Sequence, residues 1–178
     1  MDICFRRMEI SDLSQMHKWL NNDFVAQYWK DPATLDDVNA KYEPYVMGKV
    51  PTTPYIIIID GNDIGYIQTY YYSDYMDSYY DLLEVSTFTA GVDLFIGEEN
   101  YIHKGYGVHI MREFIRKHVF SNPQTKDVMI TPEPNNAVAI KVYEKVGFMW
   151  YKTITTPSEE CEFLMSLSRE DFMRSCSK

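Results

Sequence analysis

Residues 100–111, NYIHKGYGVHIM, place two glycines one residue apart directly before an apolar stretch at helical spacing. Residues 91–97, GVDLFIG, precede them and have the composition of a strand. The first N–H groups of a helix lack internal partners and carry the positive end of its dipole, so they attract anions. Gly105 and Gly107 leave this backbone open to a close ligand, and Lys104 adds positive charge. The pattern predicts a pyrophosphate-binding turn; the alternative is a tight turn that needs glycine for its conformation alone.

The rest of the chain reads as a mixture of strands and helices. We expect strands at 3–8, 54–59, 63–72, 91–97, 126–130, 148–154 and 161–167, and helices at 11–20, 34–47, 105–119, 137–145 and from 169 onward. Ser11 and Thr34 are expected N-caps, Gly147 a C-cap, and 60–62 a hairpin turn. The polar, tyrosine-rich stretch 73–90 reads as a loop. This order predicts one α/β (α+β) domain over residues 1–178, with a sheet that is antiparallel at first and has crossovers near the middle.

The composition limits the possible partners. The formal net charge is −9, which argues against a nucleic-acid surface and fits a cationic small molecule. Fifteen tyrosines suggest a site for a polar ligand, although strands also favour aromatic residues. The four histidines have no metal-ligand spacing, so we expect no metal site.

The cysteines and the apolar segments indicate the compartment. Cys4, Cys161 and Cys176 are odd in number and widely spaced, which is typical of a reducing compartment. The first residues, MDICFRRMEI, lack a signal-peptide pattern, and no apolar run is long enough to span a membrane. We therefore expect a cytoplasmic protein without a membrane partner.

A second motif gives the glycine turn a context. Residues 135–148, NNAVAIKVYEKVGF, combine an asparagine cap, an apolar stripe and a Gly-Phe exit. Together with the Gly-x-Gly turn, this resembles the GNAT superfamily of acetyl-coenzyme-A-dependent N-acetyltransferases. Ile102 departs from the Arg or Gln that begins the pyrophosphate motif in that superfamily. The resemblance implies a mixed, mostly antiparallel central sheet, splayed at the acetyl-CoA site and flanked by helices, with the pantetheine arm along residues 93–96.

The resemblance can be narrowed further. Residues 17–29, 53–71, 91–97, 103–111, 135–148 and 153–157 are similar in order and spacing to the aminoglycoside 6'-N-acetyltransferases. That family is bacterial, and the resemblance implies transfer of acetyl from acetyl-CoA to the 6'-amine of kanamycin- or tobramycin-type antibiotics, conferring resistance. The alternatives are a GNAT enzyme for another small amine or polyamine, and a non-catalytic module that binds acetyl-CoA or cations. The sequence leaves open which aminoglycosides are preferred and whether the protein is a monomer or a homodimer.

Acetyl transfer to an amine requires removal of a proton from the ammonium and benefits from an acid near the leaving thiolate. Asp93 interrupts an apolar strand, where aspartate is disfavoured, so a functional role is favoured over an exposed strand position. The resemblance places it at the 6'-amine, as base or as ammonium anchor. Tyr143 matches the tyrosine that the superfamily often places near the thiol, and is the candidate general acid; the alternative is a packed helix tyrosine.

The resemblance also supplies candidate contacts. Cofactor-binding candidates are Leu94, Phe95, Ile96, His103, Lys104, Gly105, Tyr106, Gly107, Val108 and Asn136. Acidic and aromatic side chains suit a polycationic sugar, because carboxylates pair with ammonium groups and rings stack on sugars or cations. Substrate-binding candidates are Trp29, Tyr42, Asp77, Tyr80, Glu84, Asp93, Thr131, Glu133 and Glu160. Thr131 stands where relatives often carry Asp, so one ammonium contact could pass to Glu133.

Overall fold

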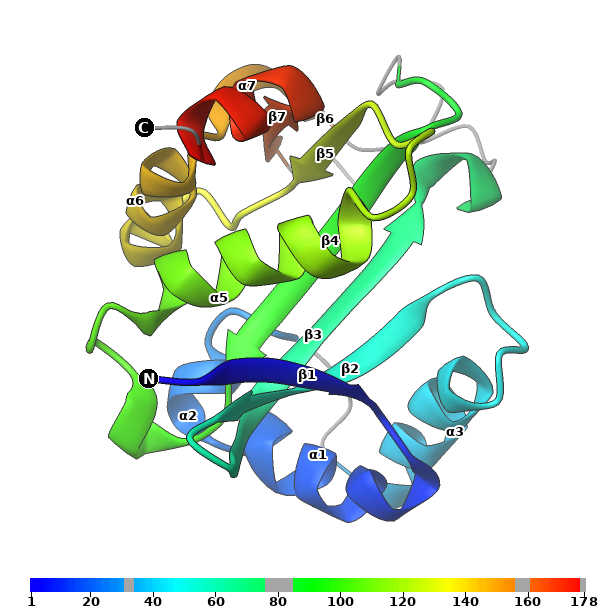
Figure 1. Cartoon of the computed structure of the whole chain (residues 1–178). Helices are drawn as coiled ribbons and strands as arrows, with labels where there is room; N and C mark the ends of the chain where they lie inside the picture. The colour runs from blue at the N-terminus through cyan, green and yellow to red at the C-terminus, as the bar shows by residue number, and fades with distance from the viewer. Residues whose placement is uncertain (31–33, 76–84, 156–160, 177–178) are drawn as a thin grey trace. The chain divides into compact units, whose positions relative to one another are not determined.

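The computed structural model describes residues 1–30, 34–75, 85–155 and 161–176. The strands are β1 (Ile3–Arg7), β2 (Thr53–Ile59), β3 (Asn62–Tyr71), β4 (Thr89–Ile96), β5 (Asp127–Ile130), β6 (Met149–Thr155) and β7 (Cys161–Ser168). The helices are α1 (Leu13–Leu20), α2 (Asp23–Ala26), α3 (Leu35–Val46), α5 (Tyr106–Phe114), α6 (Ala137–Val146) and α7 (Arg169–Cys176). Figure 1 shows the path of the chain through these elements.

The strands form a seven-stranded sheet with the order β1-β2-β3-β4-β5-β7-β6. β1 pairs antiparallel with β2, β2 with β3, β5 with β7, and β6 with β7, whereas β4 and β5 are parallel. The parallel pairing joins Thr89–Gly91 to Asp127–Met129, and β4 continues beyond it to Ile96. The predicted mixed, mostly antiparallel sheet is confirmed. Among the described helices, none has the length and apolar character that crossing a membrane requires.

The described chain divides into two compact units. The first contains Met1–Thr69 and Asp93–Ile110, and the second contains Tyr70–Val92 and Met111–Lys178. β4 therefore begins in the second unit and ends in the first.

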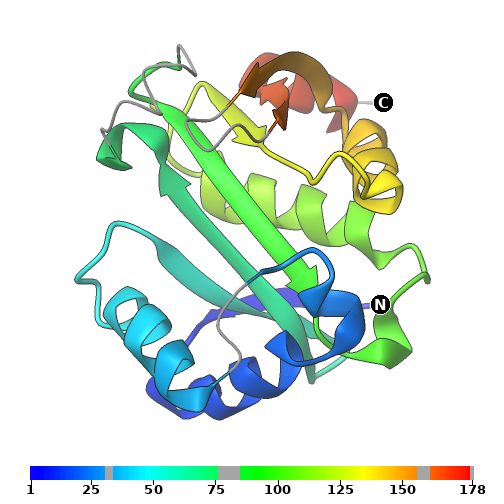
Figure 2. The ribbon, with the colours of Figure 1, turned by 180° about the vertical axis from the view of Figure 1, so that it is seen from behind.

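In the first unit, β2 and β3 form the predicted hairpin. Its two-residue turn consists of Asp60 and Gly61, both with positive φ (49° and 79°), as this tight connection requires. α1 and α3 lie next to each other (Figure 2) and bury Met16, Trp19 and Tyr42 in one core cluster. Their apolar stripes follow helical periodicity, which is why the sequence located both helices.

The starts of these helices differ in how well they were predicted. Thr34 caps α3 as predicted, and its hydroxyl accepts the N–H of Asp37 at 3.2 Å. Ser11 does not cap α1: it lies inside a 3₁₀ turn, Ile10–Asp12, that precedes the helix. Asp12 accepts the N–H of Glu9 at 2.8 Å and forms a two-pronged ion pair with Arg6 at 2.6 and 2.8 Å. A charged carboxylate with two oxygens can accept all three hydrogen bonds, whereas the single neutral oxygen of a serine cannot form the two-pronged ion pair.

In the second unit, β5, β7 and β6 form a continuous antiparallel group. Each contributes one residue to a buried core cluster: Met129, Leu164 and Ile154. The helix expected at 105–119 ends as an α-helix at Phe114 and continues as a π-helical turn, Ile115–Val119. Its expected apolar face is buried throughout: Met111, Phe114, Ile115 and Val119.

The ends of α6 lie where the sequence predicted them. The side chain of Asn136 accepts the N–H of Ala139 at 3.0 Å and caps the N-terminus. Gly147 ends the helix with φ of 119°, a conformation that favours glycine.

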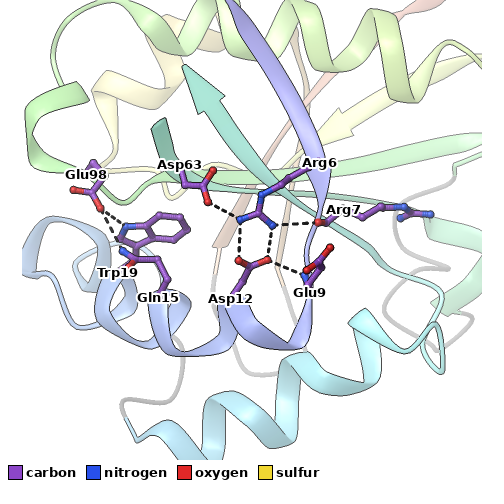
Figure 3. A network of polar contacts seen from close by, with 8 residues as sticks. All are labelled: Arg6, Arg7, Glu9, Asp12, Gln15, Trp19, Asp63 and Glu98. Atoms are coloured by element: carbon purple, nitrogen blue, oxygen red, sulfur yellow. Dashed lines mark hydrogen bonds and ion pairs between the residues drawn. The ribbon is translucent and has the colours of Figure 1, made fainter. Parts of the chain in front are cut away.

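The Arg6–Asp12 ion pair makes a testable contribution to stability (Figure 3). Burial alone would raise the pKa of Asp12, but the hydrogen bonds from Arg6 and the Glu9 N–H, with the charge of Arg6, hold that pKa below its usual value. A carboxyl whose pKa is lower in the folded than in the unfolded state stabilises the fold above its unfolded pKa, about 3.9. This contribution is lost as the pH falls through the folded-state pKa.

We therefore expect Asp12→Asn to lower the free energy of unfolding by about 1–2 kcal/mol at pH 7. The difference from the unsubstituted protein should shrink as the pH falls below about 4, which urea unfolding at several pH values would measure. Asp63→Asn, at the more exposed second partner of Arg6, should have a smaller effect. A difference that stays constant down to pH 3 would contradict the assignment.

Candidate active site

The end of β4 is held by an unusual backbone arrangement. The N–H groups of Gly97 and Glu98 both donate to the carbonyl oxygen of Ile64, at 2.8 and 3.2 Å. The neighbouring Gly65 lies so close that an added Cβ would sit 2.3 Å from the carbonyl oxygen of Phe95. β3 and the end of β4 thus approach each other more closely than side chains would allow, and this fixes where the chain leaves the sheet.

α1 also contacts this exit: Figure 3 shows Gln15 and Trp19 beside Glu98. The indole of Trp19 covers Gly97, where a Cβ would meet the ring at 2.2 Å, and donates to the Glu98 carboxylate at 2.8 Å. Gln15 donates to the same carboxylate oxygen at 3.3 Å, and Asn22 donates to the Gly97 carbonyl at 2.9 Å. No local sequence pattern indicates these contacts, because Gln15, Trp19 and Asn22 lie about eighty positions before Gly97 and Glu98.

The glycine turn begins a few residues further along. His103 and Gly105 both have positive φ, 57° and 82°, and α5 starts at Tyr106. Gly107 is not among the glycines with positive φ and lies in the first turn of α5, where alanine would favour the helix by about 1 kcal/mol. Backbone conformation therefore explains Gly105 but not Gly107. That the second glycine lets a ligand approach the helix N-terminus stays a prediction.

The side chains around this turn leave it accessible. His103, Lys104 and Gly105 are exposed, and a Cβ on Gly105 would meet no other protein atom within 4 Å. The remaining cofactor candidates in the first unit are half-buried, except for Phe95, which is buried: Leu94, Ile96, Tyr106, Gly107 and Val108.

Asp93 lies on β4, four residues before its exit, and is half-buried. Its Oδ2 accepts a hydrogen bond from the side-chain amide of Gln68, on β3, at 2.8 Å. The oxygen of that amide accepts a hydrogen bond from the hydroxyl of Tyr66 at 2.7 Å. The carboxylate that the sequence singled out is thus held by two β3 residues that the sequence reasoning did not identify.

Aromatic rings pack beside this chain of hydrogen bonds. Tyr66 and Phe95 stack with ring centroids 5.7 Å apart, and Trp29 meets Phe95 edge-on at 5.0 Å. Trp29, a predicted substrate contact, is half-buried beside these rings.

Tyr42 differs from expectation. It is fully buried, and its hydroxyl accepts the indole N–H of Trp29 at 3.1 Å. The apolar stripe of α3 turns Tyr42 into the core, so it supports Trp29 instead of lying at a surface where a substrate could touch it.

The candidates of the second unit lie on and before α6. Tyr143 is half-buried, with its ring edge-on to Phe148 at 5.9 Å. Asn136 caps α6, and Thr131 and Glu133 are half-buried in the segment between β5 and α6. The predicted substrate contacts Asp77, Tyr80, Glu84 and Glu160 lie outside the described residues. In the part of the chain that the structure describes, no group of three or more His, Cys, Asp or Glu side chains is placed to hold a metal ion.

Comparisons with known proteins agree with this arrangement. Residues 9–156 match the family model of the acetyltransferase (GNAT) domain. The chain is 30% identical to an aminoglycoside N(6')-acetyltransferase type 1 of Klebsiella pneumoniae, over 98% of this chain and 87% of that protein. The crystal structure of the aminoglycoside acetyltransferase AAC(6')-Ib in complex with coenzyme A superposes with a TM-score of 0.89 at 30% identity, over 98% of this chain and 99% of the other.

The complex of AAC(6')-Ib with coenzyme A and kanamycin gives a TM-score of 0.88, with the same identity and coverage. The chain therefore belongs to the GNAT acetyltransferases, and within them to the family of the aminoglycoside 6'-N-acetyltransferases. The GNAT fold and the acetyltransferase class expected from the sequence are confirmed.

The close approach at the β4 exit can be tested by adding a single methyl group. We expect Gly65→Ala to cost about 3 kcal/mol of unfolding free energy, because its Cβ would collide with backbone and not with a mobile side chain. Gly48→Ala is the control: its φ of 66° is strained for alanine, but a Cβ there meets nothing within 4 Å, so it should cost only about 1 kcal/mol. Equal losses in urea unfolding would show that the contact with Phe95 is unimportant.

Proposed function

We propose that this protein transfers the acetyl group of acetyl-CoA to the 6'-amine of aminoglycoside antibiotics. The observation that carries the proposal is Asp93, a carboxylate oriented by Gln68 on the strand that leads into the glycine turn. The 30% identity over nearly the whole chain to the Klebsiella pneumoniae enzyme supports the choice of substrate. In the reaction, the amine nitrogen forms a bond to the thioester carbon, the carbon–sulfur bond breaks, and coenzyme A leaves as the thiol.

Acetyl-CoA would bind through the turn at the start of α5. The unpaired N–H groups of the first helical turn, together with Lys104, suit a pyrophosphate, and Gly107 gives it access to the backbone. The pantetheine arm would run along residues 93–96, where a backbone N–H of Leu94 or Phe95 would polarise the thioester carbonyl. This brings the acetyl group to the strand that carries Asp93.

Two side chains would handle the protons. Asp93 would bind the 6'-ammonium group and accept its proton, or anchor it while solvent accepts the proton. Tyr143 would give a proton to the leaving thiolate. Because an alkylammonium has no lone pair, loss of that first proton must precede attack on the thioester.

The acceptor would be recognised by charge and by aromatic surface. A formal net charge of −9 attracts a polycationic sugar and disfavours nucleic acid. Trp29 offers a ring held in place by Tyr42 and Phe95, and Glu133 supplies a carboxylate near Thr131. Asp77, Tyr80, Glu84 and Glu160 complete the proposed contacts. We expect the protein to act in the bacterial cytoplasm, as a monomer or a homodimer.

The function can be tested by thiol release from acetyl-CoA with three acceptors measured in parallel. We expect release with kanamycin, and none with an analogue that carries a 6'-hydroxyl or with spermidine, because the site is built for one amine on a sugar. Release with spermidine alone would make the protein a polyamine acetyltransferase. No release with any of the three would leave a non-catalytic binding module and overturn the proposal.

The two proton-handling roles predict different effects for two conservative variants. Tyr143→Phe should lower kcat about 10- to 100-fold and leave the KM for kanamycin nearly unchanged, because a general acid acts only in the transition state. Asp93→Asn should lower kcat/KM by at least about 100-fold, because it removes a charge that meets the ammonium. Steady-state kinetics at saturating acetyl-CoA would measure both. A fully active Asp93→Asn protein would remove Asp93 from the site.

A further inference from the structure

We propose that Gln68 is a positioning residue for Asp93, and that the hydroxyl of Tyr66 holds the Gln68 amide in place. The inference rests on the proposed function, because it assigns a role within the acetyl-transfer site. It follows from two hydrogen bonds in series: Tyr66 hydroxyl to Gln68 Oε1 at 2.7 Å, and Gln68 Nε2 to Asp93 Oδ2 at 2.8 Å.

The geometry of the strands makes these contacts specific. Tyr66 and Gln68 are two residues apart on β3, and Asp93 and Phe95 are two residues apart on β4, so each pair points to one face of its strand. Tyr66 stacks on Phe95, and Gln68 bonds to Asp93. Two cross-strand pairs therefore lie side by side on one face, and the apolar pair fixes the register of the polar pair.

The amide of Gln68 has one orientation that satisfies both partners. An ionised carboxylate only accepts hydrogen bonds, so the NH₂ group of Gln68 must face Asp93. The amide oxygen then faces Tyr66, which can donate because a hydroxyl carries one hydrogen. A flipped amide would set its oxygen against the carboxylate, so the carboxylate itself selects this orientation. The buried Tyr66 then holds the far end of the amide in place through its hydroxyl.

Tyr66 is itself rigid. It is fully buried, and its ring is packed by Trp29 at 5.9 Å, Tyr42 at 5.6 Å and Phe95 at 5.7 Å. A side chain packed on three sides by rings has little freedom to change rotamer. The rings of Trp29, Tyr42 and Phe95 therefore hold Tyr66 in one position. Tyr66 in turn restricts Gln68, and Gln68 restricts the carboxylate of Asp93.

This constraint matters for the chemistry. A hydrogen bond to Oδ2 restricts the rotamers of Asp93, so the carboxylate keeps a more defined direction in the proposed site. Catalytic groups lose rate steeply when their direction is loose, because attack requires a defined geometry. Gln68 would therefore act on the acceptor side of the reaction, and not on the binding of acetyl-CoA.

Three variants test the assignment, with kanamycin as acceptor. Gln68→Met keeps the length and removes both polar groups, and Tyr66→Phe removes only the hydroxyl. We expect Gln68→Met to lower kcat/KM for kanamycin about 10- to 100-fold and Tyr66→Phe about 3- to 10-fold, with the KM for acetyl-CoA changed less than about twofold. Gln27→Met, at an exposed glutamine that follows α2, is the matched control and should leave all constants unchanged.

A double-mutant cycle tests whether Tyr66 acts through Gln68. If Tyr66 acts through Gln68, Tyr66→Phe should have no further effect on kcat/KM in the Gln68→Met protein. Both variants retain Asp93, so activity stays measurable. Full additivity of the two losses, or an unchanged kcat/KM in Gln68→Met, would overturn the inference. Kanamycin acetylation by the unsubstituted protein tests the proposed function separately.

Discussion

The carbonyl oxygen of Ile64 is the point on which the first unit depends, because two successive N–H groups at the end of β4 converge on it. This contact requires glycine at 65, since any Cβ there would strike the backbone of Phe95. It also requires Gly97, whose face is covered by the Trp19 indole. Asp93 lies just before this anchor and the glycine turn lies just after it. One backbone constraint therefore positions both the carboxylate and the helix N-terminus of the proposed site.

Features encoded locally could be predicted from the sequence. The hairpin turn at Asp60 and Gly61, the caps at Thr34 and Asn136, and the C-cap at Gly147 depend on residues a few positions apart, and each is confirmed. Ser11 shows the limit of such reasoning: a 3₁₀ turn precedes α1, and the Asp12 carboxylate accepts the Glu9 N–H while it also binds Arg6 on β1. The contact with Arg6 joins the turn to a strand, so residues near Ser11 alone do not indicate it.

The parts of the site that the sequence did not reveal are contacts across the sheet. Gln68 and Asp93 are separated by 25 positions, and Trp19 and Glu98 by 79, so no spacing within one element connects them. Asp93 stood out because aspartate interrupts an apolar strand, whereas a glutamine in a half-buried strand segment is not unusual. Tyr42 was a substrate-binding candidate because an aromatic ring suits a sugar, but helical periodicity turns its side chain into the core.

The proposed acetyl-transfer site combines a rigid aromatic cluster, an oriented carboxylate and a helix N-terminus that would bind the anionic cofactor. The proposed function specifies which amine of the cationic sugar is acetylated. The most direct measurement is the NMR structure of the product formed from kanamycin and acetyl-CoA, with the carbonyl carbon of the acetyl group labelled with carbon-13. We expect a single amide in which this carbonyl couples to the C6' methylene protons. Acetyl on a different amine, or a mixture of positions, would contradict it.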